Sequence, residues 1–69
     1  MDSMRLIVNG EPIERPGPCS LEALLRELKL HAERVATVVN DDVVSSGLRA
    51  ACQVQEGDRI EILTFAGGG

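Results

Sequence analysis

A stripe of leucines is the feature that most constrains how this chain can fold. It consists of Leu21, Leu24, Leu25 and Leu28. These positions are spaced i, i+3, i+4 and i+7, which places all four side chains on one face of an α-helix. Ser20 precedes the stripe and is a favourable N-cap, so we expect one amphipathic helix of about three turns, from Leu21 to near Leu30 or His31. Such a helix has to bury its stripe against another layer.

The other apolar segments are short and are predicted to be β-strands. They are Met4–Val8, Glu11–Arg15, Val35–Val39, 43–45 and 59–65. The last segment carries apolar residues on both faces, as strands in the middle of a sheet do. Residues 46–55 show no clean period and are predicted to form a loop with room for one helical turn.

Turn signals join these segments into a mixed sheet. Asn9-Gly10 predicts a hairpin between the first two strands, because a type I′ turn requires positive φ at both central positions. Pro12 cannot donate a ladder hydrogen bond and places the second strand at an edge. Because one helix covers only one face, the simplest arrangement puts the first and last strands side by side and parallel at the centre. This is the β-grasp, or ubiquitin-like, fold: an α+β domain with a mixed sheet of four to five strands and one helix on one face.

Length and charge limit what this domain can do. A chain of 69 residues is near the lower limit for one apolar core and leaves little room for a buried catalytic cleft. Its net charge of −4 and its single aromatic residue, Phe65, argue against nucleic-acid binding, which uses basic surfaces and stacking platforms. The sequence shows neither an apolar run that suits a membrane helix nor a secretory signal. We therefore expect a cytoplasmic protein with no membrane partner.

The remaining chemistry-bearing side chains predict neither an active site nor a metal site. Cys19 and Cys52 are too few for a disulfide scaffold and lack a CxxC spacing, so ordinary packing is expected for both. His31, near the predicted helix end, is expected to be structural or solvated. Residues 40–42 (Asn-Asp-Asp) predict a turn, because no His or Cys is spaced to complete a metal site with them.

Four segments of the chain are characteristic when they are taken together. They are LIVNGEP (6–12), SLEALL (20–25), EGDRIEI (56–62) and TFAGGG (64–69). Asn-Gly and Gly-Asp turns occur in many folds, whereas a β-grasp pattern that finishes on C-terminal glycines is much more particular. Over nearly the whole chain, from Met4 to Gly69, the sequence resembles the ThiS family, the sulfur carrier proteins of thiamine biosynthesis. The domain itself is predicted to span residues 4–65, after an N-terminal extension (1–3) and before a flexible glycine tail (66–69).

The resemblance implies that Gly69 is the reactive position and that the chain is a substrate of other enzymes, not an enzyme. In the family, an adenylyltransferase related to ubiquitin-activating enzymes uses ATP to adenylate the C-terminal carboxylate. A cysteine desulfurase system supplies the sulfur that gives a thiocarboxylate, and thiazole synthase consumes that sulfur. The resemblance thus implies a carrier with no catalytic residue and no bound cofactor or metal of its own.

A glycine tail suits this chemistry physically. Gly67, Gly68 and Gly69 have no Cβ, so their backbone can enter a narrow site of a partner enzyme. Residues 66–69 span at most about 13–14 Å when extended, enough to carry the carboxylate clear of the domain. The alternative is that these glycines are a frayed end or a cloning remnant.

A partner-docking face is a second expectation. Strand alternation turns Ile7, Leu63 and Phe65 away from the helix if their neighbours in sequence form the core. Val38 joins them if Val35 and Val39 belong to the core. Left uncovered, these side chains would form an apolar patch beside the root of the tail, and such patches mark partner sites. The alternative is that loops cover them, or that the strand phase is shifted by one residue.

Other functions remain open on the sequence. The small subunit of molybdopterin synthase shares the fold, the tail and the thiocarboxylate chemistry, and a carrier for another sulfur pathway is also compatible. The short chain and its segment 6–12 favour the thiamine type. A ubiquitin-like modifier would use the same activated carboxylate to form isopeptide bonds with lysines. A plain interaction module would carry an inert tail.

Overall fold

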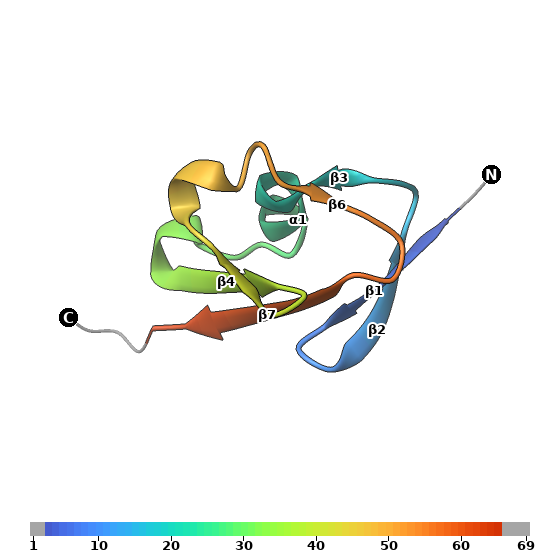
Figure 1. Ribbon diagram of the computed structural model, residues 1–69, viewed down its shortest axis with the longest axis horizontal. Helices are drawn as coiled ribbons and strands as arrows, with labels where there is room; N and C mark the ends of the chain where they lie inside the picture. Colours follow the sequence, from blue (N-terminus) through green and yellow to red (C-terminus); the bar gives the residue numbers. More distant parts are fainter. Residues whose placement is uncertain (1–2, 66–69) are drawn as a thin grey trace.

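The computed structural model describes residues 3–65 and contains a five-stranded mixed sheet. In spatial order the strands are β2 (Glu11–Arg15), β1 (Met4–Val8), β7 (Arg59–Thr64), β4 (Val35–Val39) and β5 (Asp42–Val44). β1 and β7 are parallel neighbours, and the other neighbouring pairs are antiparallel. The helix α1 (Leu21–Glu27) lies against one face of the sheet (Figure 1). The predicted β-grasp fold is confirmed, with its central parallel pair and with β2 at an edge.

One hydrophobic core fills the space between α1 and the sheet. Its buried members are Met4, Leu6, Leu21, Leu24, Leu25, Val35, Val54, Ile60 and Ile62. Leu28, the last residue of the predicted stripe, is partly buried against this core. The residues of the central strands that face the helix are therefore those that strand alternation predicts. A strand phase shifted by one residue is ruled out.

The helix α1 begins as predicted and ends earlier than predicted. Ser20 is the N-cap, and its Oγ accepts a hydrogen bond from the amide of Ala23 at 3.0 Å. Lys29 adopts a left-handed conformation with φ of 61°. Its amide donates to the carbonyl of Arg26, and the amide of Leu30 donates to that of Leu25, which is the pattern of a Schellman motif. The expected end near Leu30 or His31 was wrong because this motif stops the helix.

Two-residue turns of the same kind join the hairpins. Asn9 and Gly10 have φ of 52° and 85°, and Asn40 and Asp41 have φ of 50° and 74°, as type I′ turns require. The second turn places Asp42 opposite Val39, so β5 begins one residue before the predicted segment 43–45. At the other end of the sheet, β7 ends at Thr64 instead of residue 65, because β4 has no strand residue left to pair with beyond Val35.

Three short elements escaped the sequence-based prediction. β3 (Cys19–Ser20) and β6 (Gln53–Val54) pair antiparallel next to α1, and the 3-10 helix η1 (Ala32–Arg34) precedes β4. Segments of two or three residues are too short to show a period in the sequence. The helical turn allowed for in 46–55 is present as the 3-10 helix η2 (Ser46–Leu48).

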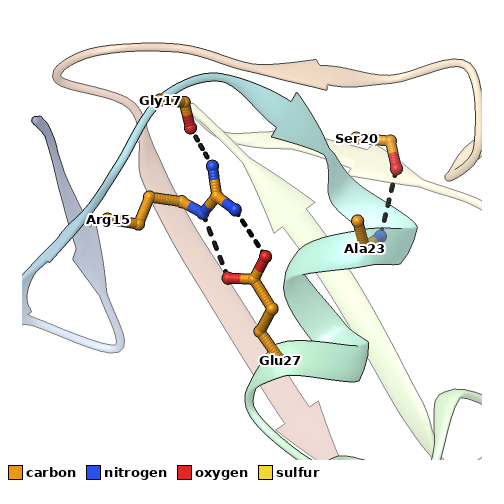
Figure 2. Close-up of polar contacts among 5 residues, drawn as sticks. All are labelled: Arg15, Gly17, Ser20, Ala23 and Glu27. Carbon is orange, nitrogen blue, oxygen red and sulfur yellow. Dashed lines mark hydrogen bonds and ion pairs between the residues drawn. The ribbon is translucent and has the colours of Figure 1, made fainter. Parts of the chain in front are cut away.

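An arginine at the end of β2 ties the sheet to the helix (Figure 2). Nε of Arg15 donates to Oε1 of Glu27 at 3.1 Å, and Nη2 pairs with Oε2 of the same carboxylate. Nη1 donates to the carbonyl of Gly17, so the same guanidinium also holds the loop that leaves β2. The hydrogen bond with Arg15 lowers the pKa of Glu27 and raises that of Arg15.

Candidate functional site

The root of the predicted tail is the central strand β7. The reactive glycine of the prediction, Gly69, lies outside the described residues, as do Gly67, Gly68 and the first two residues of the extension. Phe65, the last described residue, donates its amide hydrogen to the carbonyl of Arg34 at 2.9 Å. The chain therefore leaves the sheet at a point that is fixed by a main-chain hydrogen bond.

The outer face of the sheet carries exposed apolar side chains around this point. Leu63 and Phe65 are 55% and 59% exposed, and Val38 is half-buried. The pairing register puts Leu63 opposite Ala36 and puts Val38 opposite Val43. Side chains that are paired across a sheet point to the same face, so Leu63 is a neighbour of Ala36, and Val38 of Val43, on the outer face. Alternation with the buried residues Ile62 and Thr37 turns Leu63 and Val38 away from α1, as predicted, whereas Phe65 lies beyond the last paired residue of β7.

Val43 on β5 completes this group and was missed in the sequence. It is 78% exposed, the most exposed of the large apolar residues that the structure describes. The Asn40-Asp41 turn was the signal that could have found it, because a two-residue turn places Val38 opposite Val43. We call Val38, Val43, Leu63 and Phe65 the tail-side patch.

Ile7 does not belong to the tail-side patch. It is 37% exposed and its outward orientation is as predicted, but it pairs with Arg59 at the opposite end of β7. Leu63 lies four positions after Arg59, a distance of about 13 Å along a strand. The outer face between them carries Glu61, and Arg59 forms an ion pair with Asp41 at 3.0 Å. The predicted docking residues thus fall into two separate groups.

A shallow groove of about 480 Å³ lies beside the root of the tail. Its lining residues come from α1, η1, β4, β5 and η2: Glu22, Ala32, Glu33, Val35, Ala36, Thr37, Val43, Val44, Ser45, Ser46, Arg49 and Phe65. Two of these, Thr37 and Arg49, are the buried polar residues of the described chain, and Arg49 is only 5% exposed. No role for Arg49 was predicted from the sequence, because a basic residue in a segment without a period carries no signal.

The other candidate side chains stay apart from this site. His31 is exposed before η1 and makes no side-chain cap hydrogen bond. Cys19 and Cys52 are half-buried free thiols, and burial raises the pKa of Cys19, which makes it a poorer nucleophile at neutral pH. Within residues 3–65, the structure holds no cluster of three or more His, Cys, Asp or Glu side chains that could bind a metal ion. In the same described part of the chain, no helix has the length and apolar character to cross a membrane.

A family model decides the identity of the domain. The model of the ThiS family matches residues 6–69, which include the glycine tail. The chain belongs to the ThiS family. The resemblance to the ThiS family that the sequence predicted is therefore confirmed.

Solved structures agree with this ThiS assignment. The crystal structure of the thiamine biosynthesis protein ThiS from Geobacter metallireducens is 38% identical and superposes with a TM-score of 0.84, covering 96% of this chain and 100% of that one. An NMR solution structure of a thiamine biosynthesis protein from the same organism is 36% identical, with a TM-score of 0.80 over 96% of this chain and 88% of that one.

Two kinds of curated relative also match this ThiS-family chain. Thiazole synthases from Magnetococcus marinus and Paramagnetospirillum magneticum are 42% and 38% identical over 66 residues. The match covers 96% of this chain but 20% of each of those proteins, so this chain spans about a fifth of their length. The uncharacterized protein ycf40 of Porphyra purpurea is 36% identical over 62 residues, which cover 90% of this chain and 87% of that protein.

Proposed function

We propose that this protein is a sulfur carrier whose C-terminal Gly69 is adenylated and then converted to a thiocarboxylate for thiazole formation in thiamine biosynthesis. The observation that carries the proposal is the ThiS-family match, which runs through the glycines to Gly69. The position of β7 supports it, because the central strand leads directly to residues 66–69. The carrier is a substrate of its partner enzymes and supplies the acyl group.

The chemistry proceeds in two substitutions at the carboxyl group of Gly69. A carboxylate oxygen attacks the α-phosphorus of ATP, the bond between that phosphorus and the bridging oxygen breaks, and pyrophosphate leaves. Sulfur at the oxidation level of sulfide then attacks the carbonyl carbon, the bond to the AMP oxygen breaks, and AMP leaves. The acyl adenylate is needed because a free carboxylate is a poor electrophile.

Three partners are part of the proposal. An adenylyltransferase related to ubiquitin-activating enzymes binds ATP, so the carrier needs no bound cofactor. A cysteine desulfurase system delivers the sulfur as a persulfide, and a thiol that is oxidised to a disulfide reduces it to the oxidation level of sulfide. Thiazole synthase consumes it, and this role is supported by the relatives of that name that contain a segment similar to this chain. A cytoplasmic location remains a prediction.

The tail-side patch is the proposed contact surface for these enzymes. It is apolar and exposed, and it lies at the end of β7 from which the tail departs. An enzyme that covers Leu63 and Phe65 would hold the carrier with its tail directed into the active site. Apolar side chains that are buried at the centre of an interface contribute most of its binding energy. Ile7, which the sequence included in the docking face, is left outside this proposed contact.

Adenylation in vitro tests the proposed function directly. The full chain and a variant that lacks Gly69 are compared in ATP–pyrophosphate exchange with the adenylyltransferase of the same organism. The variant still ends in a carboxylate, but that group is drawn back by one residue, about 3.5 Å. We expect exchange with the full chain and a loss of at least tenfold in the variant, since misplacement of this size removes the near-attack geometry. Equal exchange rates would contradict the role of Gly69.

A further inference from the structure

Arg49 is a buried cation without a buried anion beside it. Its side chain is 5% exposed, yet among residues 3–65 no carboxylate oxygen lies within salt-bridge distance of its guanidinium. A buried charge is unfavourable unless hydrogen bonds compensate for the lost water. The partners of this guanidinium therefore indicate what the residue does.

The guanidinium donates hydrogen bonds to three neutral oxygens of η1 and β4. Nη1 donates to the carbonyl of Ala32 at 2.8 Å, and Nη2 donates to the carbonyl of Val35 at 2.7 Å. Nε donates to Oγ1 of Thr37 at 3.2 Å, and that hydroxyl in turn donates to the carbonyl of Val44 on β5. Because the donors of a guanidinium are held in one rigid plane, Arg49 fixes η1, the start of β4 and β5 relative to one another.

The turn that Arg49 holds is also the turn that holds the root of the tail. Arg34 lies between Ala32 and Val35, and its carbonyl accepts the amide hydrogen of Phe65 at 2.9 Å. Val35 pairs with Thr64, the last residue of β7. Arg49 and Phe65 also line the same groove. A displacement of η1 would therefore move the last main-chain contact before residues 66–69.

We infer that Arg49 is a positioning residue for the adenylation reaction: through η1 it fixes the position of Phe65, the residue from which the tail continues. This inference rests on the proposed function, because it assigns a residue that orients the same reactive carboxylate. Arg49 acts through Arg34 and Phe65 and is not part of the tail-side patch. Its loss should therefore reduce the rate at which the bound tail reacts more than it reduces docking.

The test compares Arg49→Met with Arg15→Met, a matched control. Both substitutions keep an unbranched apolar stem and remove a guanidinium that donates to the main chain, to two carbonyls in Arg49 and to that of Gly17 in Arg15. Arg15 ends β2, on the side of the molecule opposite to the end of β7 (Figure 1). In ATP–pyrophosphate exchange we expect kcat to fall about tenfold for Arg49→Met, with KM for the carrier within about twofold. Arg15→Met should match the wild type, and Arg49→Lys, which keeps a donor, should be intermediate.

Hydrogen exchange at the amide of Phe65 is the second readout, and it requires no enzyme. The exchange rate should increase in Arg49→Met and stay unchanged in Arg15→Met. Circular dichroism verifies that both variants are folded. If Arg49→Met does not fold, Arg49→Lys and Thr37→Val are read in the same two assays; Thr37→Val removes both the acceptor of Nε and the hydrogen bond to the carbonyl of Val44. Equal kcat and equal Phe65 exchange in the Arg49 and Arg15 variants would overturn the inference. A wild-type chain that supports no pyrophosphate exchange would overturn the proposed function instead, and the Phe65 amide would still decide on Arg49.

Discussion

The amide of Phe65 donates to the carbonyl of Arg34 at 2.9 Å, so the last described residue is fastened to the turn before β4. This contact lies one residue beyond the β4–β7 ladder, whose last pair is Val35 and Thr64. It has the consequence that the position of the tail root depends on η1 as well as on the sheet.

Leu63→Glu should weaken the complex with the adenylyltransferase by at least about tenfold, because a charge would be buried in an apolar contact. Leu48→Glu is the matched control: Leu48 is 60% exposed, close to the 55% of Leu63, but it lies on η2 outside the tail-side patch. Titration calorimetry measures both affinities, and circular dichroism verifies that both variants are folded. Equal affinities of the two variants would exclude the patch as the contact surface.

Lys29→Gly should stabilise the fold by about 0.5–1 kcal/mol, since a left-handed conformation is unfavourable for a residue with a Cβ. Lys29 occupies the position of the Schellman motif at which glycine is usual, with φ of 61°. Lys29→Ala keeps the Cβ and should give no such gain. Urea unfolding of the three proteins provides the comparison, and a destabilised glycine variant would show that the lysine makes a compensating contact.

Glu27→Gln should remove part of the pH dependence of stability. The hydrogen bond with Arg15 lowers the pKa of Glu27 below its ordinary value of 4.5. Between the lowered pKa and the ordinary value, the unfolded chain binds more protons than the folded one, so the free energy of unfolding rises with pH there. The contribution of Glu27 is therefore present above the ordinary carboxyl pKa and is lost as the pH falls through the lowered pKa.

Urea midpoints of wild type and Glu27→Gln should consequently differ most at neutral pH and converge in acid. Glu14→Gln serves as control, because Glu14 pairs with Arg5 at 3.2 Å on the open surface, where an ion pair contributes little. A difference between wild type and Glu27→Gln that is constant with pH would show that Glu27 contributes no linked protonation.

Local signals were enough to predict the main elements of the fold. The leucine stripe, the Asn9-Gly10 turn and the β-branched segments each depend on neighbours within a few residues, and the structure agrees with them. The helix end could not be predicted in the same way. Lys29 is not a residue type that signals a left-handed conformation, and only the hydrogen bonds around it reveal the motif.

The site required contacts between distant parts of the chain. The separation of Ile7 from Leu63 follows from the register between β1 and β7, which no local pattern encodes. Arg49 reaches carbonyls 14 and 17 residues away in sequence, so its role depends on how η2 and η1 pack. The glycines themselves were found from the sequence through the family resemblance, and the structure adds the strand and the turn that lead to them.

The intact mass of the protein, purified from its native source without reducing agents, shows whether Gly69 carries a thiocarboxylate. We expect a fraction that is heavier than the unmodified chain by one oxygen-to-sulfur exchange, with the added mass on the C-terminal peptide that ends in Gly69. A thiol-selective alkylating reagent should add mass to the C-terminal peptide of this fraction alone, apart from any reaction at Cys19 and Cys52. A chain found solely with a free carboxylate under conditions of active thiamine synthesis, or joined through Gly69 to lysines of other proteins, would contradict the account.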